Sequence, residues 1–94
     1  MDSKKLGVDK VILNSLDYCN LYVIEKGEKI LLLYLFDRGD YIYFKIMPPV
    51  IGKWENCENA IYTGIGLFGF VKKGEDLEDK IKEKIEVLES IGIS

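Results

Sequence analysis

Residues 21–47 read LYVIEKGEKILLLYLFDRGDYIYFKIM, which is three β-rich runs separated by two short polar segments. Gly27 lies in the first polar segment and Gly39 in the second. Because glycine readily takes the positive φ of a tight hairpin turn, the stretch predicts three consecutive antiparallel strands. The middle run, residues 29–36, is apolar from its second residue onward. It therefore predicts a central strand that is covered on both faces of the sheet.

The C-terminal part of the chain, residues 75–92, predicts an amphipathic helix. Its acidic residues crowd the first turn, where they favour the helix dipole, Glu78 can pair with Lys82 four residues on, and Gly92 stands where a helix C-cap glycine belongs. One apolar stripe at helical spacing should pack this helix on the sheet; it consists of Leu77, Ile81, Ile85, Leu88 and Ile91.

The segment from Val8 to Cys19 has apolar residues at three- and four-residue steps, and Asp9 can cap it. A short N-terminal helix is therefore favoured, although Val11-Ile12-Leu13 also suits a strand. After the third strand, Pro48-Pro49 ends β structure and begins a long loop.

Residues 60–71 then predict one long bent strand or two short ones. Their glycines, at 64, 66 and 69, indicate a bulge or the close approach of a backbone or an aromatic ring. The sequence as a whole predicts one α+β domain over residues 1–94. Its small antiparallel sheet should be a meander of four to five strands, packed against the C-terminal amphipathic helix, with a short N-terminal helix.

Composition excludes several functional classes. The chain has no His, which removes the commonest general base and metal ligand, so we expect neither catalysis nor a cofactor or metal site. The longest apolar run has seven residues, far below the roughly 20 that span a bilayer. The N-terminus lacks a signal-peptide pattern, so we expect a cytoplasmic protein in which Cys19 and Cys57 are free buried thiols. Abundant Lys, Glu and Ile without Gln suits a thermophile or an AT-rich genome.

The first functional hypothesis is a small non-catalytic protein-interaction module of regulatory or accessory type. A central strand that is apolar on both faces needs two covers, and the C-terminal helix supplies only one. The second cover is either the N-terminal segment or a second copy of the chain, and we favour a homodimer. Trp54 follows Pro48-Pro49 in a polar loop and is the candidate contact residue, since Trp is common at interface hot spots. The alternative is that its ring folds back over the core.

The second hypothesis is a nucleic-acid-binding module. Phe68-Gly69-Phe70-Val71 resembles the centre of the RNP1 strand of RNA-recognition domains, in which alternating aromatic side chains stack on bases. The topology departs from that family, because two strands and a loop occupy the place of its helix. An aromatic sheet face with lysines around it remains as the hypothesis, against a net charge of −3 and against a plain structural role for the rings. Its candidate contacts are Tyr41, Tyr43, Lys45, Tyr62, Phe68, Phe70, Lys72 and Lys73.

Overall fold

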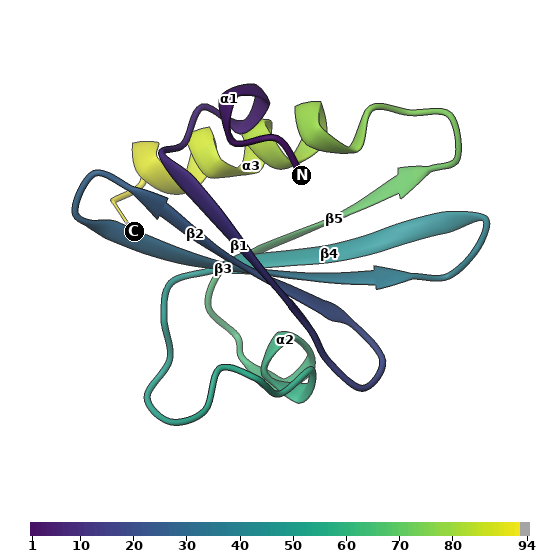
Figure 1. The fold of residues 1–94 in the computed structure, drawn as a ribbon, viewed down its shortest axis with the longest axis horizontal. Coiled ribbons are helices and arrows are strands. Elements are labelled where there is room, and N and C mark those ends of the chain that lie inside the picture. The colour runs from purple at the N-terminus through teal and green to yellow at the C-terminus, as the bar shows by residue number, and fades with distance from the viewer. Residues whose placement is uncertain (93–94) are drawn as a thin grey trace.

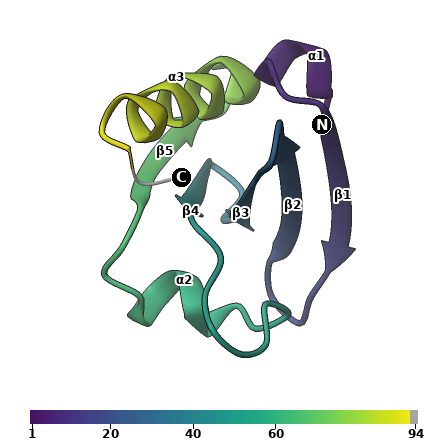
Figure 2. The same cartoon turned by 90° about the vertical axis from the view of Figure 1, so that its left-hand side faces the viewer.

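The computed structural model describes residues 1–92 and contains a five-stranded antiparallel sheet whose strand order follows the sequence (Figure 1). Helices α1 and α3 lie on one face of the sheet and the shorter α2 lies on the other (Figure 2). The predicted α+β meander is confirmed. The elements are α1 (Ser3–Leu6), β1 (Lys10–Ser15), β2 (Asn20–Lys26), β3 (Lys29–Asp37), β4 (Tyr41–Met47), α2 (Glu58–Tyr62), β5 (Leu67–Lys72) and α3 (Leu77–Ser90).

The two predicted hairpin turns are present. Gly27 has φ of 62° between β2 and β3, and Gly39 has φ of 89° between β3 and β4. The carboxylate of Asp9, which precedes β1, accepts a hydrogen bond of 2.6 Å from the Gly27 N–H. Both glycines therefore adopt the left-handed backbone that side chains disfavour, which fixes the register of the central hairpins.

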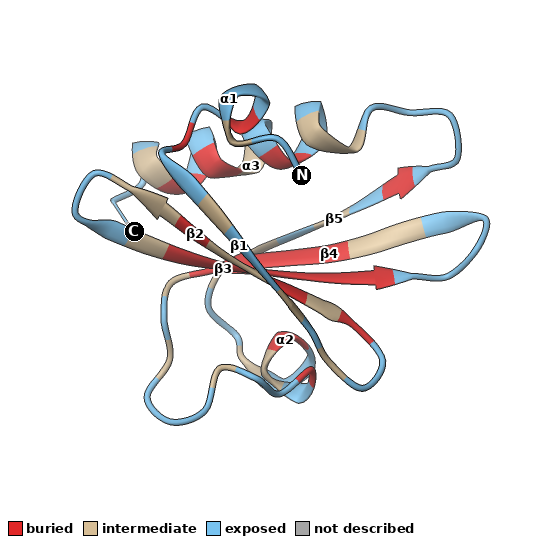
Figure 3. Ribbon diagram, viewed as in Figure 1, coloured by how far each residue is buried: buried red, intermediate tan, exposed pale blue. Residues whose placement is uncertain are grey.

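The central strand β3 is covered on both faces, as its apolar sequence predicts (Figure 3). Leu31 and Leu33 pack in the cluster beneath α3, together with Phe44 of β4. Leu32 and Tyr34 point the opposite way and pack in a second cluster. Because successive side chains of a strand alternate between faces, one continuous apolar run supplies both cores.

Helix α3 confirms the C-terminal prediction and buries Ile81, Ile85 and Leu88 against the sheet. Asp76 caps its N-terminus and Gly92 follows its end with φ of 73°, although Ile91, the last member of the predicted stripe, is exposed. Among residues 1–92, no helix is long and apolar enough to cross a membrane.

The predicted pairing of Glu78 with Lys82 is replaced by contacts to α1. One Glu78 carboxylate oxygen accepts the Asp2 N–H at 2.6 Å, and the other lies 3.6 Å from the Lys5 ammonium. These contacts hold the start of the chain against the first turn of α3. Both contacts help to hold α1 on the same face of the sheet as α3.

A short N-terminal helix is present, but it is α1 and not the predicted segment from Val8 to Cys19, most of which forms β1 and its turn into β2. β1 pairs antiparallel with β2 from Lys10 opposite Glu25 onward. The apolar residues of this segment do not show strand alternation, because β1 is an edge strand and buries few side chains. Val11 packs beneath α3, whereas Leu13 on the same face is exposed. The helix prediction for this segment is therefore wrong.

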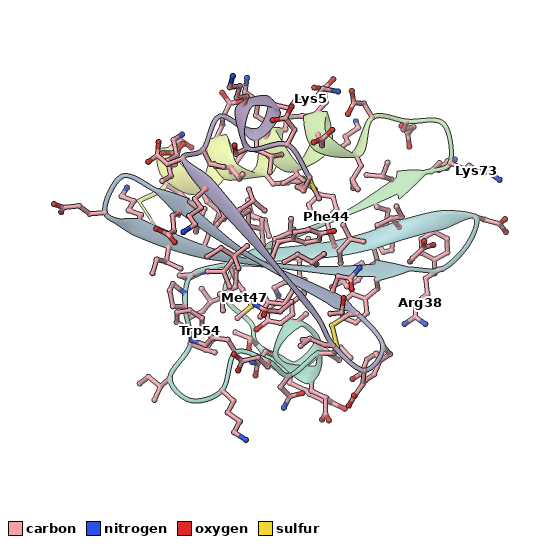
Figure 4. All side chains as sticks on the ribbon, viewed as in Figure 1. Lys5, Arg38, Phe44, Met47, Trp54 and Lys73 are labelled. Atoms are coloured by element: carbon pink, nitrogen blue, oxygen red, sulfur yellow. A yellow bond between two sulfur atoms is a disulfide. The ribbon has the colours of Figure 1, made fainter. Side chains whose placement is uncertain are left out.

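Residues 48–66 cover the second face of the sheet. The two covers considered from the sequence were the N-terminal segment and a second copy of the chain. Within this connection α2 places Ala60 in the second cluster beside Met47. Cys57, at the start of α2, forms a disulfide with Cys19, whose Cα lies 6.0 Å away at the β1–β2 turn. The prediction of free thiols is wrong, because the fold places the start of α2 beside the β1–β2 turn. Figure 4 draws Met47 and Trp54 on this side and Phe44 on the α3 side.

The predicted strand over residues 60–71 forms only from Leu67 onward, because residues 60–62 belong to α2. The close approaches expected at its glycines are present. A Cβ on Gly66, which has φ of 111°, would lie 2.5 Å from the Ile46 carbonyl oxygen. A Cβ on Gly69 would lie 2.7 Å from the Phe44 ring, which covers this glycine across the β4–β5 ladder. Glycine at both positions lets β5 dock on β4.

Candidate interaction surface

Four aromatic side chains from β4 and β5 form one continuous group on the face of the sheet opposite α3, and we call Tyr41, Tyr43, Phe68 and Phe70 the aromatic surface. Tyr43 lies directly opposite Phe70 in the β4–β5 ladder. Their ring centroids are 5.2 Å apart, and the Tyr41 and Phe70 centroids are 5.8 Å apart. Such tilted contacts are a favourable arrangement for aromatic pairs.

The outer part of this surface is open to solvent. Phe68 and Phe70 are each 57% exposed, and Tyr41 is 41% exposed. The layer formed by residues 48–66 packs over Leu32 and Tyr34, towards the middle of the sheet. Tyr43 lies at the boundary between the covered and open parts, and its partial burial raises the pKa of its phenol above the ordinary value. The connection therefore covers only part of this face.

The chain of rings extends further than the sequence predicted. Phe36 of β3 lies 5.5 Å from Tyr43, and Tyr18 of the β1–β2 turn lies 6.1 Å from Phe36. The Arg38 guanidinium stands 5.9 Å from the Phe36 ring centroid. The sequence could have predicted that Phe36 belongs to this group, because the β3–β4 hairpin places it opposite Tyr43 on the same face. Nothing in the sequence indicated Tyr18, since its position depends on the β1–β2 turn.

Charges of both signs border the aromatic surface at the β3–β4 turn. A shallow hollow of about 470 Å³ is lined there by Asp40, Tyr41, Phe70, Lys72 and Lys73. The Lys72 backbone N–H donates to the Glu75 carboxylate at 2.8 Å, which brings a further acid to the same end. The border is therefore mixed in sign.

Two of the predicted nucleic-acid contacts lie outside the aromatic surface. Lys45 is only 7% exposed, and its ammonium donates to the Thr63 carbonyl at 2.8 Å, so it ties β4 to the end of α2. Tyr62 lies on α2, where it is 78% exposed. The structure thus brings together Tyr41, Tyr43, Phe68, Phe70 and Lys72 of the predicted set, with Lys73 at the edge.

Trp54 is half-buried and lies against the second cluster (Figure 4). Its indole N–H donates to the Val50 carbonyl at 3.0 Å, and its own carbonyl accepts from the Tyr34 hydroxyl at 2.7 Å. Both contacts belong to the covering layer formed by residues 48–66. The partly exposed Trp54 ring is thus one part of the cover over the second cluster. A role for Trp54 in binding another protein stays a prediction.

The buried Tyr34 hydroxyl is the main polar anchor of the covering layer. It donates to Trp54 and accepts from the Asn59 side-chain amide at 3.2 Å. Burial raises the pKa of the Tyr34 phenol above its ordinary value of 10.0; the Asn59 hydrogen bond acts against this rise and the Glu55 carboxylate adds to it. The neutral phenol is therefore the form that the folded protein stabilises.

The raised pKa of Tyr34 predicts a loss of stability in alkali. Unfolded tyrosine ionises near pH 10, whereas the folded Tyr34 ionises only at higher pH. Stability is thus fully present below pH 10 and falls as the pH rises through the folded pKa. We expect Tyr34→Phe to reduce this fall, measured by urea unfolding at pH 8, 10 and 11. Tyr22→Phe, which removes a hydroxyl from the other face, is the control; an equal change in both variants would contradict the assignment.

No protein-family model matches this chain, and no curated protein or solved structure is similar enough to it to indicate a relative.

Proposed function

We propose that the protein is a small non-catalytic interaction module, of regulatory or accessory type, that forms a homodimer through the aromatic surface. The observation that carries the proposal is the 57% exposure of Phe68 and of Phe70 on adjacent positions of one sheet face. Both rings contact Tyr43, so the exposed apolar area is continuous rather than scattered. Continuous apolar patches of this kind mark contact sites, and aromatic side chains are enriched at the centres of interfaces.

The border of the aromatic surface favours a protein partner over a polyanion. Lys72 and Lys73 share the hollow with Asp40, and Glu75 lies at the same end. A border that carries both signs offers no uniform positive potential to a polyanion, and it does not repel a second copy of the chain. A phosphate backbone would instead meet the acidic groups, and the whole chain has a net charge of −3.

Light scattering coupled to size exclusion tests the proposal. We expect a mass near twice 10.8 kDa at micromolar concentration. Phe68→Ser/Phe70→Ser should raise the dissociation constant at least about tenfold, because two partly buried rings are lost from the contact. Tyr62→Ser is the matched control, since it removes a more exposed ring outside the aromatic surface. A wild-type monomer at all concentrations, or a dimer unchanged in the double variant, would contradict the proposal.

Binding of single-stranded nucleic acid is the second candidate. It is supported by the placement of Lys72 beside the exposed Tyr41 and Phe70 rings, which is an arrangement suited to base stacking next to a phosphate. The same preparations can be titrated with a fluorescent oligonucleotide at two salt concentrations. Salt-sensitive binding that Lys72→Glu/Lys73→Glu abolishes would favour this candidate; no binding at low salt excludes it.

We also propose that the protein works in the cytoplasm of a thermophile. The proposal is supported by the Lys- and Glu-rich composition and the Cys19–Cys57 disulfide, since intracellular disulfides are common in hyperthermophiles. A thermal unfolding midpoint above about 90 °C is the expected outcome. A midpoint in the mesophilic range of about 45–65 °C would count against the thermophile source.

A further inference from the structure

The outer edge of β5 carries free backbone hydrogen-bonding groups. Within residues 1–92, β5 pairs with β4 only, and Figure 2 shows it at the margin of the sheet beneath α3. The Lys73 N–H donates to the Asp40 carbonyl in the β3–β4 turn, whereas the Lys72 N–H donates to Glu75. Because successive N–H groups of a strand point to opposite sides, the N–H and C=O groups of Phe68 and Phe70 point away from β4.

The sequence of β5 is symmetric in residue type about Gly69. It reads Leu-Phe-Gly-Phe-Val from Leu67 to Val71, so an aromatic and then an aliphatic residue follow the glycine in each direction. A two-fold axis through Gly69 therefore places like against like. An isologous contact places residue i of one copy against residue j of the other, and j against i. In β5 both residues of each such pair are of one type, so the strand matches a second copy of itself.

We propose that β5 of one copy pairs antiparallel with β5 of a second copy across a two-fold axis at Gly69, which joins two five-stranded sheets into one. The proposal deepens and rests on the proposed homodimer. Phe68 then lies opposite Phe70 of the second copy, and both residues of each pair offer their outward N–H and C=O groups to the other. The occupant of the edge is thus a second copy of this chain.

The pairing also accounts for the position of the aromatic surface. Phe68 and Phe70 are the members nearest the axis, and they are the two rings that are 57% exposed. In the pair, the aromatic surfaces of both copies become one continuous group on the same face of the joined sheet. Lys72 comes opposite Gly66 of the second copy, so no like charges face each other across the ladder.

β5 suits this pairing better than β1, the other edge of the sheet. Each edge strand has one lysine at an end, Lys72 in β5 and Lys10 in β1, but β1 also ends with the polar Asn14 and Ser15. The five residues from Leu67 to Val71 of β5 are uncharged, so the charges that discourage pairing with another chain are absent from this stretch. The exposed Leu13 of β1 lies opposite one ring, that of Tyr22, whereas Phe68 lies beside two rings, with centroids 6.2 Å from Tyr43 and 6.3 Å from Phe70.

Cysteine cross-linking tests the register. The chain's two native cysteines are joined in the Cys19–Cys57 disulfide, so an introduced cysteine supplies the free thiol. Opposite residues of a hydrogen-bonded pair have Cα atoms about 5.5 Å apart, which a disulfide can bridge. Phe68 of one copy lies roughly 8–9 Å from Phe68 of the other, which is too far. Differently tagged Phe68→Cys and Phe70→Cys proteins, mixed and mildly oxidised, should therefore cross-link at least about tenfold more than either alone.

Amide hydrogen exchange of the unaltered protein supplies the second measurement, since cysteine substitution also weakens the contact. We expect the Phe68 and Phe70 amides to exchange at least about tenfold more slowly as concentration is raised into the dimer range. Ile12 and Leu13 of β1 should not change. A dimer by light scattering in which these β5 amides stay unprotected, or in which β1 is protected instead, overturns the β5 pairing and leaves the proposed function standing. A monomer at every concentration overturns both.

Discussion

Cys19→Ser/Cys57→Ser is expected to lower the free energy of unfolding by about 4 kcal/mol, because the disulfide joins residues 38 apart in sequence and restricts the unfolded chain. Stabilities of small domains are about 5–15 kcal/mol, so this is a large share. The folded state loses a further constraint, since the bond links α2 to the β1–β2 turn. Residues 48–66 would then be held on the sheet mainly by Tyr34, by Lys45 and by the packing of Ala60.

Urea unfolding followed by circular dichroism measures this effect. The oxidised protein should unfold at a higher urea concentration than the reduced protein, and the serine variant should match the reduced protein. Adding reductant to the serine variant is the control and should change nothing. A loss below about 1 kcal/mol would mean that the unfolded chain gains little freedom when the bond is cut, contrary to the loop-closure argument.

Phe44→Ala is expected to cost about 3–5 kcal/mol of unfolding free energy, because it empties a fully buried ring position. Phe44 is 0% exposed and lies beneath α3 with Ile85 and Leu88. Its ring also covers Gly69, which has no side chain of its own to fill that space. The loss should therefore be felt in β5 as well as in the core.

Phe44→Leu is the matched comparison, since it keeps most of the apolar volume and should cost clearly less than the alanine change. Urea unfolding gives the two free energies, and amide exchange in β5 reports whether the strand has loosened. If Phe44→Ala destabilised the protein while the β5 amides kept their protection from β4, the link between Phe44 and β5 would be wrong. Loosening of β5 should also weaken dimer formation in proportion.

The parts of the fold that could be predicted are those with strong local chemistry. Gly27 and Gly39 occupy turns that need positive φ, and the apolar run of β3 requires two covers. The stripe on α3 repeats over several turns, so four of its five residues pack as expected. In each case the side chains nearby in sequence decide the structure, which is why the meander and the C-terminal helix were predicted correctly.

The errors concern segments whose structure depends on distant contacts. β1 buries too little to show strand alternation, and its pairing with β2 outweighs the helical spacing of Val11 and its neighbours. Helix α2 has five residues, too few to show a helical period. The pairing of Cys19 with Cys57 becomes evident only when α2 lies beside the β1–β2 turn.

The aromatic surface was predicted in part for the same reason. Strand alternation correctly placed Tyr41, Tyr43, Phe68 and Phe70 together, because these residues are two apart on paired strands. The exposure of Lys45 depends on the covering layer instead. Lys45 is on the expected face, but it is buried there, and its ammonium donates a hydrogen bond to the Thr63 carbonyl at the end of α2.

The Cys19–Cys57 bond closes a covalent ring that contains β2, β3 and β4, the three inner strands. When the oxidised protein is unfolded, these strands stay confined to that ring, and hairpins of this type form within about 1–10 μs. Strand β5 lies outside the ring and joins β4 only after residues 48–66 have closed a long connection. We therefore expect refolding to begin in the ring and to finish at β5, so that the strand carrying Phe68 and Phe70 docks last.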